Sequence, residues 1–430
     1  MSISVVILAA GQGTRMKSST PKVLHKISGK PMLFHAIDVS KALSDDITVV
    51  LYHQAELIKN EVENHYENIH FHMQDVKKYP GTGGAMKGIE VKHDKVLILN
   101  GDMPLVTIDA LNTLTNGDAD INMSVINLDN PTGYGRVVIF NDKVHEIIEE
   151  KDCIPAQKKI QKVNAGVYCV KKEILDTYIP MLNNYNAQRE YYLTDIIKFA
   201  VEDKKVVNPI LVIEEEFKGV NSKFDLALAK DIMQRRIRAK WMNEGVSMRL
   251  PETIYIDICA TFEGECMIEN GVSIEGASHI VSSYIKTNSV IEDSYIENSD
   301  IGPMGHIRPN SKIINTHIGN FVEVKKSILN GVKAGHLSYI GDASIEEGSN
   351  IGAGVITCNY DGKNKFKTTI GKNVFVGSDT QLVAPVNIAD DVMIAAGTTV
   401  TKDVSSGDLV ISRNPQKSIK DFFYKFFKKA

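Results

Sequence analysis

Residues 370–400 decide the fold of half of this chain, and they read IGKNVFVGSDTQLVAPVNIADDVMIAAGTTV. An aliphatic residue recurs at every sixth position, at Ile370, Val376, Leu382, Ile388, Ile394 and Val400. A period of six held without a slip is typical of hexapeptide repeats. Each repeat forms one flat side of a coil, three sides complete the coil, and the aliphatic side chain points inward.

The same spacing extends back toward Pro251, with interruptions. It is carried by Ile268, Ile274, Ile280, Ile296, Ile301, Ile307, Ile313, Ile318, Ile340, Ile345 and Ile351. The pattern predicts a parallel β-helix; a β-sandwich of short strands is the alternative, and the regular period argues against it. The repeat breaks between Thr357 and Thr368, which predicts a loop ejected from the prism, a natural place for function.

The first half of the chain alternates between strand and helix signals. Residues 5–10, 47–52, 95–100 and 121–126 are apolar runs typical of buried strands, and residues 31–43 are typical of a helix. This alternation predicts an α/β fold with a mostly parallel sheet covered by helices on both faces. Ligands of such folds bind at the carboxyl ends of the strands, where Asp102 is expected.

A helical pattern over residues 223–244, ended by Gly245, separates the two halves. We therefore predict an α/β domain over residues 1–222 and a connecting helix over residues 223–245. A β-helix domain with a C-terminal tail is expected over residues 246–430.

Composition excludes several classes of protein. The chain has 430 residues, 43% of them hydrophobic, and a net charge of −4, which argues against a dedicated nucleic-acid binder. Its five cysteines are scattered, so neither a disulfide framework nor a zinc site is expected, and a cytoplasmic location fits. The apolar run at residues 3–10 is too short to span a membrane and has no basic residue before it, so a buried strand is the better interpretation.

A glycine-rich turn follows the first predicted strand and reads LAAGQGTRM over residues 8–16. Glycines allow the backbone to approach phosphates, and Arg15 with the nearby Lys22 adds two cations. The turn lacks the third glycine of the dinucleotide fingerprint and the Gly-Lys-Ser/Thr of a P-loop.

Further motifs follow this turn in a fixed order. They are residues 81–85 (GTGGA), 100–105 (NGDMPL), 133–136 (GYGR), 149–152 (EEKD), 163–166 (VNAG), 190–195 (EYYLTD) and 219–222 (GVNS), and, in the second half, residues 320–326 (NFVEVKK), 333–339 (KAGHLSY), 350–354 (NIGAG) and 358–362 (CNYDG). The first set resembles the sugar-1-phosphate nucleotidyltransferases. The two sets together resemble the bifunctional N-acetylglucosamine-1-phosphate uridylyltransferase/glucosamine-1-phosphate N-acetyltransferase family over nearly the entire chain. The handedness of the β-helix, left-handed, is also implied by this resemblance.

For uridylyl transfer from UTP to N-acetylglucosamine-1-phosphate, the resemblance implies that Arg15 and Lys22 neutralise phosphates and that Asp102 and Asn221 bind Mg²⁺ as hard oxygen donors. The implied contacts to the UDP-sugar come from Leu8, Ala9, Ala10, Gly11, Lys22, Gln74, Gly81, Thr82, Gly135, Glu149, Asn164 and Asn221. Among these, Gln74, Gly81 and Thr82 are expected at the uracil, and Gly135, Glu149 and Asn164 at the sugar.

For acetyl transfer from acetyl-CoA to glucosamine-1-phosphate, a base must accept a proton from the attacking amine. Histidine titrates near neutral pH, and His336 in the Lys-Ala-Gly-His context is the predicted base. The resemblance implies Arg308 and Lys325 at the phosphate and Tyr339 and Asn350 at the sugar. It implies contacts to acetyl-CoA from Ala353, Asn359, Tyr360, Ser378, Ala396 and Arg413, and a homotrimer with sites between neighbouring prisms.

The tail over residues 421–429 (DFFYKFFKK) is aromatic and basic. A short helix packed on the trimer is the favoured interpretation, and contact with a membrane surface is the alternative. Two other functions remain open: a single-function nucleotidyltransferase whose β-helix only assembles or regulates, and a non-enzymatic scaffold. The Lys333 to His336 motif and the Asn359-Tyr360 loop argue against the first, because an inert β-helix needs neither. The motif order of Arg15, Lys22, Asp102 and Asn221 argues against the second.

Overall fold

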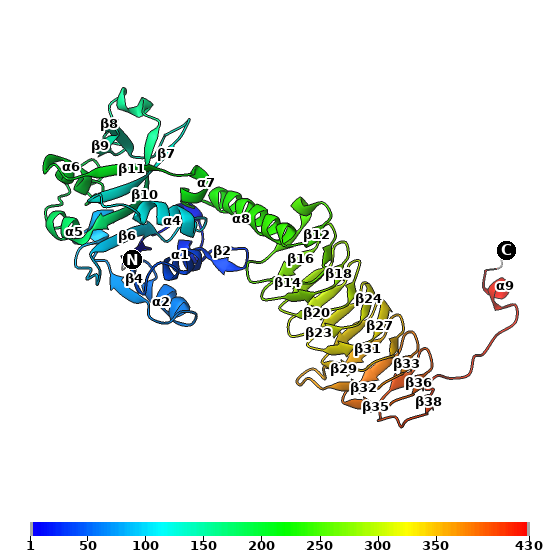
Figure 1. Cartoon of the computed structure of the whole chain (residues 1–430). Coiled ribbons are helices and arrows are strands. Elements are labelled where there is room, and N and C mark those ends of the chain that lie inside the picture. Colours follow the sequence, from blue (N-terminus) through cyan, green and yellow to red (C-terminus); the bar gives the residue numbers. More distant parts are fainter. Residues whose placement is uncertain (1–2, 428–430) are drawn as a thin grey trace. The chain divides into compact units, whose positions relative to one another are not determined.

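The structure, a computed structural model, describes residues 3–427. The chain divides into two compact units, the first ending at Gln234 and the second beginning at Arg235. The division falls within helix α8 (Lys223–Asn243), which occupies the segment where the sequence predicts a connecting helix (Figure 1).

The first unit is built on a sheet with the strand order β11-β7-β10-β6-β1-β4-β5. Strand β1 pairs in parallel with β4 and β6, whereas β10 is antiparallel to both of its neighbours, so the sheet is mostly parallel as predicted. The strands are β1 (Ile3–Leu8), β4 (Asp46–Leu51), β5 (His70–Met73), β6 (Lys95–Asn100), β7 (Ile121–Asn127), β10 (Lys162–Lys171) and β11 (Val207–Leu211), with the hairpins β2 (Lys26–Ile27)/β3 (Lys30–Pro31) and β8 (Arg136–Phe140)/β9 (Lys143–Ile148). The helices are α1 (Met32–Lys41), α2 (Ala55–Glu63), α3 (Thr82–Ala85), α4 (Ile108–Thr115), α5 (Lys172–Tyr178), α6 (Asp195–Glu202) and α7 (Glu214–Phe217), with short turns η1 (Thr14–Met16), η2 (Lys22–Leu24) and η3 (Gln157–Lys159).

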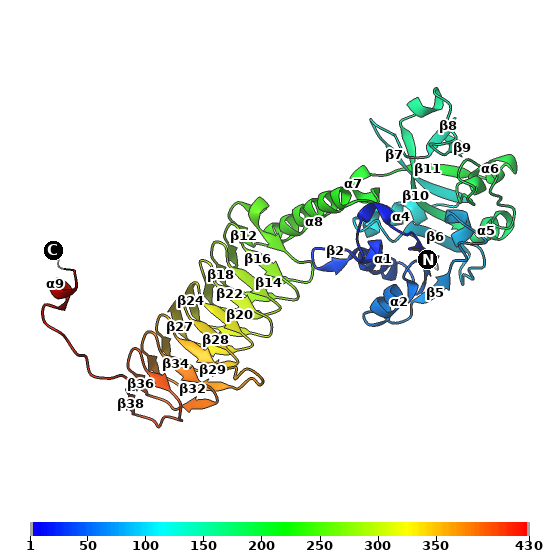
Figure 2. The same cartoon turned by 180° about the vertical axis from the view of Figure 1, so that it is seen from behind.

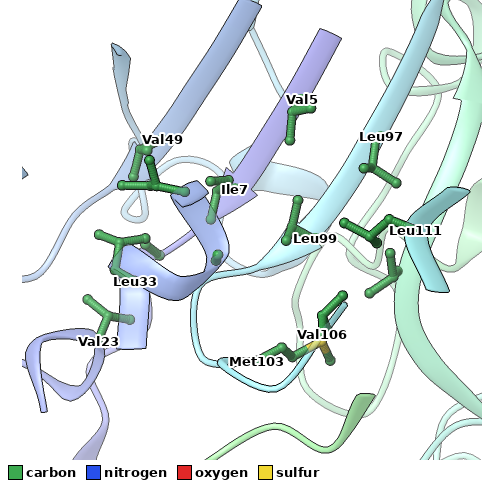
Figure 3. Packing of buried hydrophobic residues seen from close by; sticks show 14 of the residues in the cluster. Val5, Ile7, Val23, Leu33, Val49, Leu97, Leu99, Met103, Val106 and Leu111 are labelled. Atoms are coloured by element: carbon green, nitrogen blue, oxygen red, sulfur yellow. The ribbon is translucent and has the colours of Figure 1, made fainter. Parts of the chain in front are cut away.

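Successive residues of a strand point to opposite sides of the sheet. In this sheet both sides are buried, each by its own cluster of hydrophobic side chains. On one side Ile7 and Leu99 pack with Leu33 of α1 (Figure 3). On the other side Val6 packs in a cluster with Ile196 of α6. Covering both faces leaves the carboxyl ends of the central strands as the place where polar residues gather.

The second unit is a prism of three parallel sheets, which we call the first, second and third faces. The first face contains β12 (Ser247–Met248), β15 (Met267–Ile268), β18 (Tyr284–Ile285), β21 (Asp300–Ile301), β24 (His317–Asn320), β27 (Lys333–His336), β30 (Asn350–Ile351), β33 (Phe375–Val376), β36 (Met393–Ile394) and β38 (Leu409–Val410). The second face contains β13 (Tyr255–Ile256), β16 (Ser273–Glu275), β19 (Val290–Glu292), β22 (His306–Arg308), β25 (Glu323–Lys325), β28 (Tyr339–Gly341), β31 (Ile356–Cys358), β34 (Gln381–Val383) and β37 (Thr399–Val400). The third face contains β14 (Thr261–Glu263), β17 (His279–Val281), β20 (Tyr295–Glu297), β23 (Lys312–Ile314), β26 (Ile328–Asn330), β29 (Ala343–Ile345), β32 (Thr368–Ile370) and β35 (Val386–Ile388).

The predicted inward residues form the core of this prism. Ile351, Val376 and Ile394 are direct partners in consecutive strands of the first face and are at most 3% exposed. Stacking like side chains at each coil buries them without a second layer of structure. A parallel β-helix, consistent with the left-handed form, therefore follows the α/β domain, and the predicted fold class is confirmed.

The ejected loop is also confirmed. It runs over residues 359–367 between β31 and β32 and protrudes from the edge of the coils in both views (Figures 1 and 2). Beyond the prism, the tail forms the short helix α9 (Phe422–Phe426), and its Lys428 and Lys429 lie outside the described residues. Within residues 3–427, every helix is too short or too polar to cross a membrane.

Candidate active sites

A cavity of about 490 Å³ opens at the carboxyl ends of β1 and β6. Its wall contains nine of the residues predicted for uridylyl transfer: Leu8, Ala9, Ala10, Gly11, Lys22, Gln74, Gly81, Thr82 and Asp102. Tyr52, Asn100 and Glu190 line it too. Sequence reasoning assigned no contact role to these three, although Asn100 and Glu190 stand in quoted motifs.

Lys22 connects the cavity to Asn221. Its ammonium group forms an ion pair with Asp102 and donates a hydrogen bond of 2.8 Å to Asn221 Oδ1. The backbone fixes the same arrangement, because the Val220 amide donates to the Asp102 carbonyl at 2.9 Å. The side-chain oxygens of Asp102 and Asn221 therefore converge on one position, and the Lys22 ammonium group lies there.

Gly13 is needed for Lys22 to lie against the glycine-rich turn. Its φ of +63° is in the left-handed region, and an added Cβ would stand 2.6 Å from Lys22 Cβ. The neighbouring Arg15 lies in η1 with an exposed side chain and is not among the residues of the cavity wall. The structure therefore does not bring Arg15 together with Lys22 and Asp102.

Gln74 is buried beside the same cavity. Its side-chain amide donates to the carbonyls of Tyr79 and Gly81, at 3.0 Å each. These bonds hold the segment that carries Gly81 and leave the Gln74 side-chain oxygen as the group able to face a ligand.

The three residues predicted for the sugar also lie together. The Asn164 amide donates to the Gly135 carbonyl at 2.9 Å, and a Cβ added at Gly135 would lie 3.3 Å from Glu149 Oε1. Burial raises the pKa of Glu149, although a hydrogen bond of 3.1 Å from the Thr194 hydroxyl partly opposes this. A half-buried carboxyl group beside a buried glycine suits the recognition of sugar hydroxyls.

In the second unit, Arg308 and Lys325 are direct partners on the second face of the prism. Glu323 accepts a hydrogen bond of 2.8 Å from Arg308 and pairs in register with Tyr339 on the same face. Asn350 is on the first face, opposite Lys333. One chain therefore gathers Arg308, Lys325 and Tyr339 on one surface and leaves Asn350 on another.

Four of the six residues predicted for acetyl-CoA form a column along the corner between the first and second faces, namely Ala353, Ser378, Ala396 and Arg413, whereas Asn359 and Tyr360 lie on the loop that follows β31. The Ala353 carbonyl accepts from the Asp379 amide at 2.7 Å, and the Ser378 carbonyl accepts from the Gly397 amide at 2.9 Å. The Arg413 guanidinium donates to the Ala396 carbonyl. His336 has an exposed side chain and ends β27, whose Ala334 is in register with Ile351, so His336 heads the same corner column.

The ejected loop contributes a residue that sequence reasoning missed. The ammonium group of Lys365 lies beside that of Lys325 and lowers the pKa of Lys325; desolvation and the Arg308 charge add to the effect. Three cations that converge on one surface are a site for a polyanion. The basic residues of the loop were the available signal, but the sequence did not indicate which of them turns toward Lys325.

Comparison with known proteins agrees with this division. Residues 5–163 match the family model of the MobA-like NTP transferase domain, and residues 367–402 match that of the bacterial transferase hexapeptide, six repeats. The fold and its two sites thus define a nucleotidyltransferase joined to a hexapeptide-repeat transferase.

Curated relatives match the chain from end to end. A protein of a Sulfurovum species is 70% identical over 99% of both chains. One of a Nitratiruptor species is 60% identical over 100% of both, and one of Aliarcobacter butzleri is 58% identical over 99% of this chain and 98% of its own. Each is named bifunctional protein GlmU, and this chain belongs to the GlmU family.

The chain is accordingly a bifunctional enzyme of UDP-N-acetylglucosamine synthesis, an acetyltransferase and a uridylyltransferase. The single-function and scaffold alternatives are set aside, because the relatives cover both halves. Nucleotidyl transfer in this family implies a divalent metal, the substrates are small molecules, and the hexapeptide β-helix indicates oligomerisation.

Proposed function

We propose that uridylyl transfer takes place in the cavity beside Lys22 and Asp102, and that acetyl transfer takes place where the second face meets the corner headed by His336. The observation that carries the first assignment is the convergence of Lys22, Asp102 and Asn221 at a cavity at the strand ends. Incubating the protein with glucosamine-1-phosphate, acetyl-CoA, UTP and Mg²⁺ should yield UDP-N-acetylglucosamine, and the variants described below assign each step.

The proposed metal is Mg²⁺, held by Asp102 and Asn221. A carboxylate and an amide oxygen are ligands that a hard divalent ion accepts, and the Lys22 ammonium between them supports a cation position there. Within residues 3–427 no cluster of three or more His, Cys, Asp or Glu side chains could hold a metal, so substrate phosphates and water would supply further ligands. Bound Mg²⁺ would neutralise charge that develops on the phosphates.

In uridylyl transfer, a phosphate oxygen of the sugar attacks the α-phosphorus of UTP and pyrophosphate leaves. Both reactants are polyanions, so positioning and charge neutralisation dominate the catalysis. Lys22 neutralises the nucleotide phosphates, Gln74, Gly81 and Thr82 contact the uracil, and Glu149 and Asn164 orient the sugar. Arg15 reaches the phosphates only if its turn closes over the cavity, since its side chain is exposed.

In acetyl transfer, the amine of glucosamine-1-phosphate attacks the thioester carbonyl of acetyl-CoA, the C–S bond breaks and CoA leaves as its thiolate. His336 accepts the proton that the amine loses. Arg308, Lys325 and Lys365 hold the phosphate, and acetyl-CoA lies along the column of Ala353, Ser378, Ala396 and Arg413. Because Asn350 is on a different face from Arg308 in one chain, we propose a homotrimer in which neighbouring prisms complete each site. We also propose a cytoplasmic location, which the five free thiols support.

The two activities should be separable, because each unit has its own core. Both clusters that cover the first sheet end at or before Phe217. A fragment of residues 1–245 should keep uridylyl transfer at a rate near that of the whole chain and lose acetyl transfer, as measured by pyrophosphate release and by thiol release from acetyl-CoA. A folded fragment without uridylyl transfer would contradict independent sites.

Lys365→Gln should raise the KM for glucosamine-1-phosphate by about tenfold or more, the effect of losing one charge-assisted hydrogen bond. It should leave the KM for UTP unchanged. Lys363→Gln is the matched control, because it removes an exposed charge from the same loop. Equal KM values for the two variants would place the phosphate elsewhere.

A further inference from the structure

The loop over residues 359–367 is held together by its own hydrogen bonds. It joins the prism through two stems, which are Asn359 at its start and Lys367-Thr368 at its end. At its tip, the Asp361 carboxylate accepts from the amides of Lys363 and Asn364 at 2.8 and 2.6 Å. At its base, the Phe366 amide donates to the Asn359 carbonyl at 2.8 Å. These bonds set the shape of the loop, but they do not fix where the loop points.

Asp342 contacts both stems. Its carboxylate accepts a hydrogen bond of 2.6 Å from the Asn359 side-chain amide, and its carbonyl accepts from the Thr368 amide at 3.2 Å. Asn359 is only 6% exposed, so its amide has little access to water and depends on this acceptor. The aspartate therefore ties the start and the end of the loop to the corner that follows β28.

The space beside this contact is filled. A Cβ added at Gly341 would stand 2.5 Å from the Tyr339 hydroxyl and 2.8 Å from Asn359 Nδ2. Only a glycine lets the Tyr339 ring and the Asn359 amide approach the strand so closely. Asn359 is thus held between a glycine and a carboxylate.

Asp342 also stands within the cation cluster. Its negative charge acts on Lys325, against the repulsion from Lys365 and Arg308. A carboxylate near a phosphate site weakens anion binding if charge alone matters. Charge repulsion between Asp342 and a bound phosphate would therefore disfavour substrate binding, so Asp342 must contribute to the site in another way.

We propose that Asp342 is a positioning residue for acetyl transfer, which holds the loop through Asn359 so that Tyr360 and Lys365 reach the substrates. Asp342 touches neither substrate. The inference rests on the proposed acetyl-transfer site and adds to it the group that fixes the loop.

The direction in which Asp342→Ala changes the KM for glucosamine-1-phosphate distinguishes a positioning role of Asp342 from a purely electrostatic one. Asp342→Ala removes the acceptor, so it should raise the KM for glucosamine-1-phosphate by about tenfold or more and change kcat less. If Asp342 acted only as a nearby charge, the same substitution would lower that KM. Asp342→Asn keeps an oxygen acceptor for Asn359 and should rescue most of the loss.

A second measurement does not depend on activity. Trypsin should cut the Asp342→Ala trimer after Lys363 or Lys365 faster than it cuts the unsubstituted protein or Asp342→Asn, because a released loop opens more often. Asp293→Ala is the matched control. Asp293 also follows a second-face strand with positive φ, and its amide bonds the preceding coil as that of Asp342 does. An unchanged circular dichroism spectrum and an unchanged elution volume in gel filtration show that the β-helix of each variant is folded.

Wild-type or lowered KM in Asp342→Ala, or equal loss in Asp342→Ala and Asp342→Asn, would overturn the proposal. Lys365→Gln separates this failure from that of the site itself. If Lys365→Gln raises the KM and Asp342→Ala does not, only the positioning role fails. If neither variant changes the KM, the proposed phosphate site fails as well.

Discussion

Asp102→Ala should lower kcat for uridylyl transfer by about 10²- to 10³-fold or more, the scale of lost charge stabilisation in a transition state. The substitution removes one of two proposed protein ligands of the metal and the ionic partner of Lys22. The charge that develops on departing pyrophosphate then lacks its counter-ion. Acetyl transfer should be unaffected, because its residues lie in the other unit.

The measurement is pyrophosphate release at saturating UTP over a range of Mg²⁺ concentrations. Asp102→Asn keeps an oxygen donor and should need more Mg²⁺ rather than lose all activity. Asp118→Ala, an exposed aspartate of the same unit, is the matched control. Normal uridylyl transfer by folded Asp102→Ala protein would refute the assignment.

His336→Ala should lower kcat for acetyl transfer by about 10²- to 10⁴-fold, the usual contribution of a positioned general base. The KM for glucosamine-1-phosphate should change little, because Arg308 and Lys325 lie on the second face and keep their places.

Thiol release from acetyl-CoA measures this rate, and an unchanged circular dichroism spectrum shows that the β-helix of the variant is folded. His317→Ala is the matched control, because His317 lies on the same face and contacts Asp300 at 2.7 Å. A raised KM with wild-type kcat in His336→Ala would make His336 a binding residue. The base would then have to be sought elsewhere, for example in a water held by neighbouring polar groups.

Local patterns in the sequence were enough for the fold. One inward aliphatic per six residues is both the signal and the cause of the β-helix, since each such side chain is buried by its equivalents in adjacent coils. The strand before Asp102 was predicted at its observed bounds, residues 95–100, because a parallel strand buried on both faces is a continuous apolar run. The helix over residues 223–243 was found from its period and its terminal glycine.

The contacts that build the sites depend on the tertiary structure. Lys22 meets Asp102 and Asn221 across 80 and 199 residues of chain, and no local pattern encodes such distances. The motifs named these residues as a set, whereas the fold placed Lys22 between the two oxygen donors and left Arg15 outside the cavity wall. In the prism, a 9-residue loop interrupts one coil between β31 and β32 and folds back over the preceding coil. Lys365 then lies beside Lys325, and Asp342 contacts Asn359. Sequence period sets which side chains point inward, but the outward neighbours of a coil are set by how the coils stack and where the loop folds back, and only the three-dimensional structure determines these.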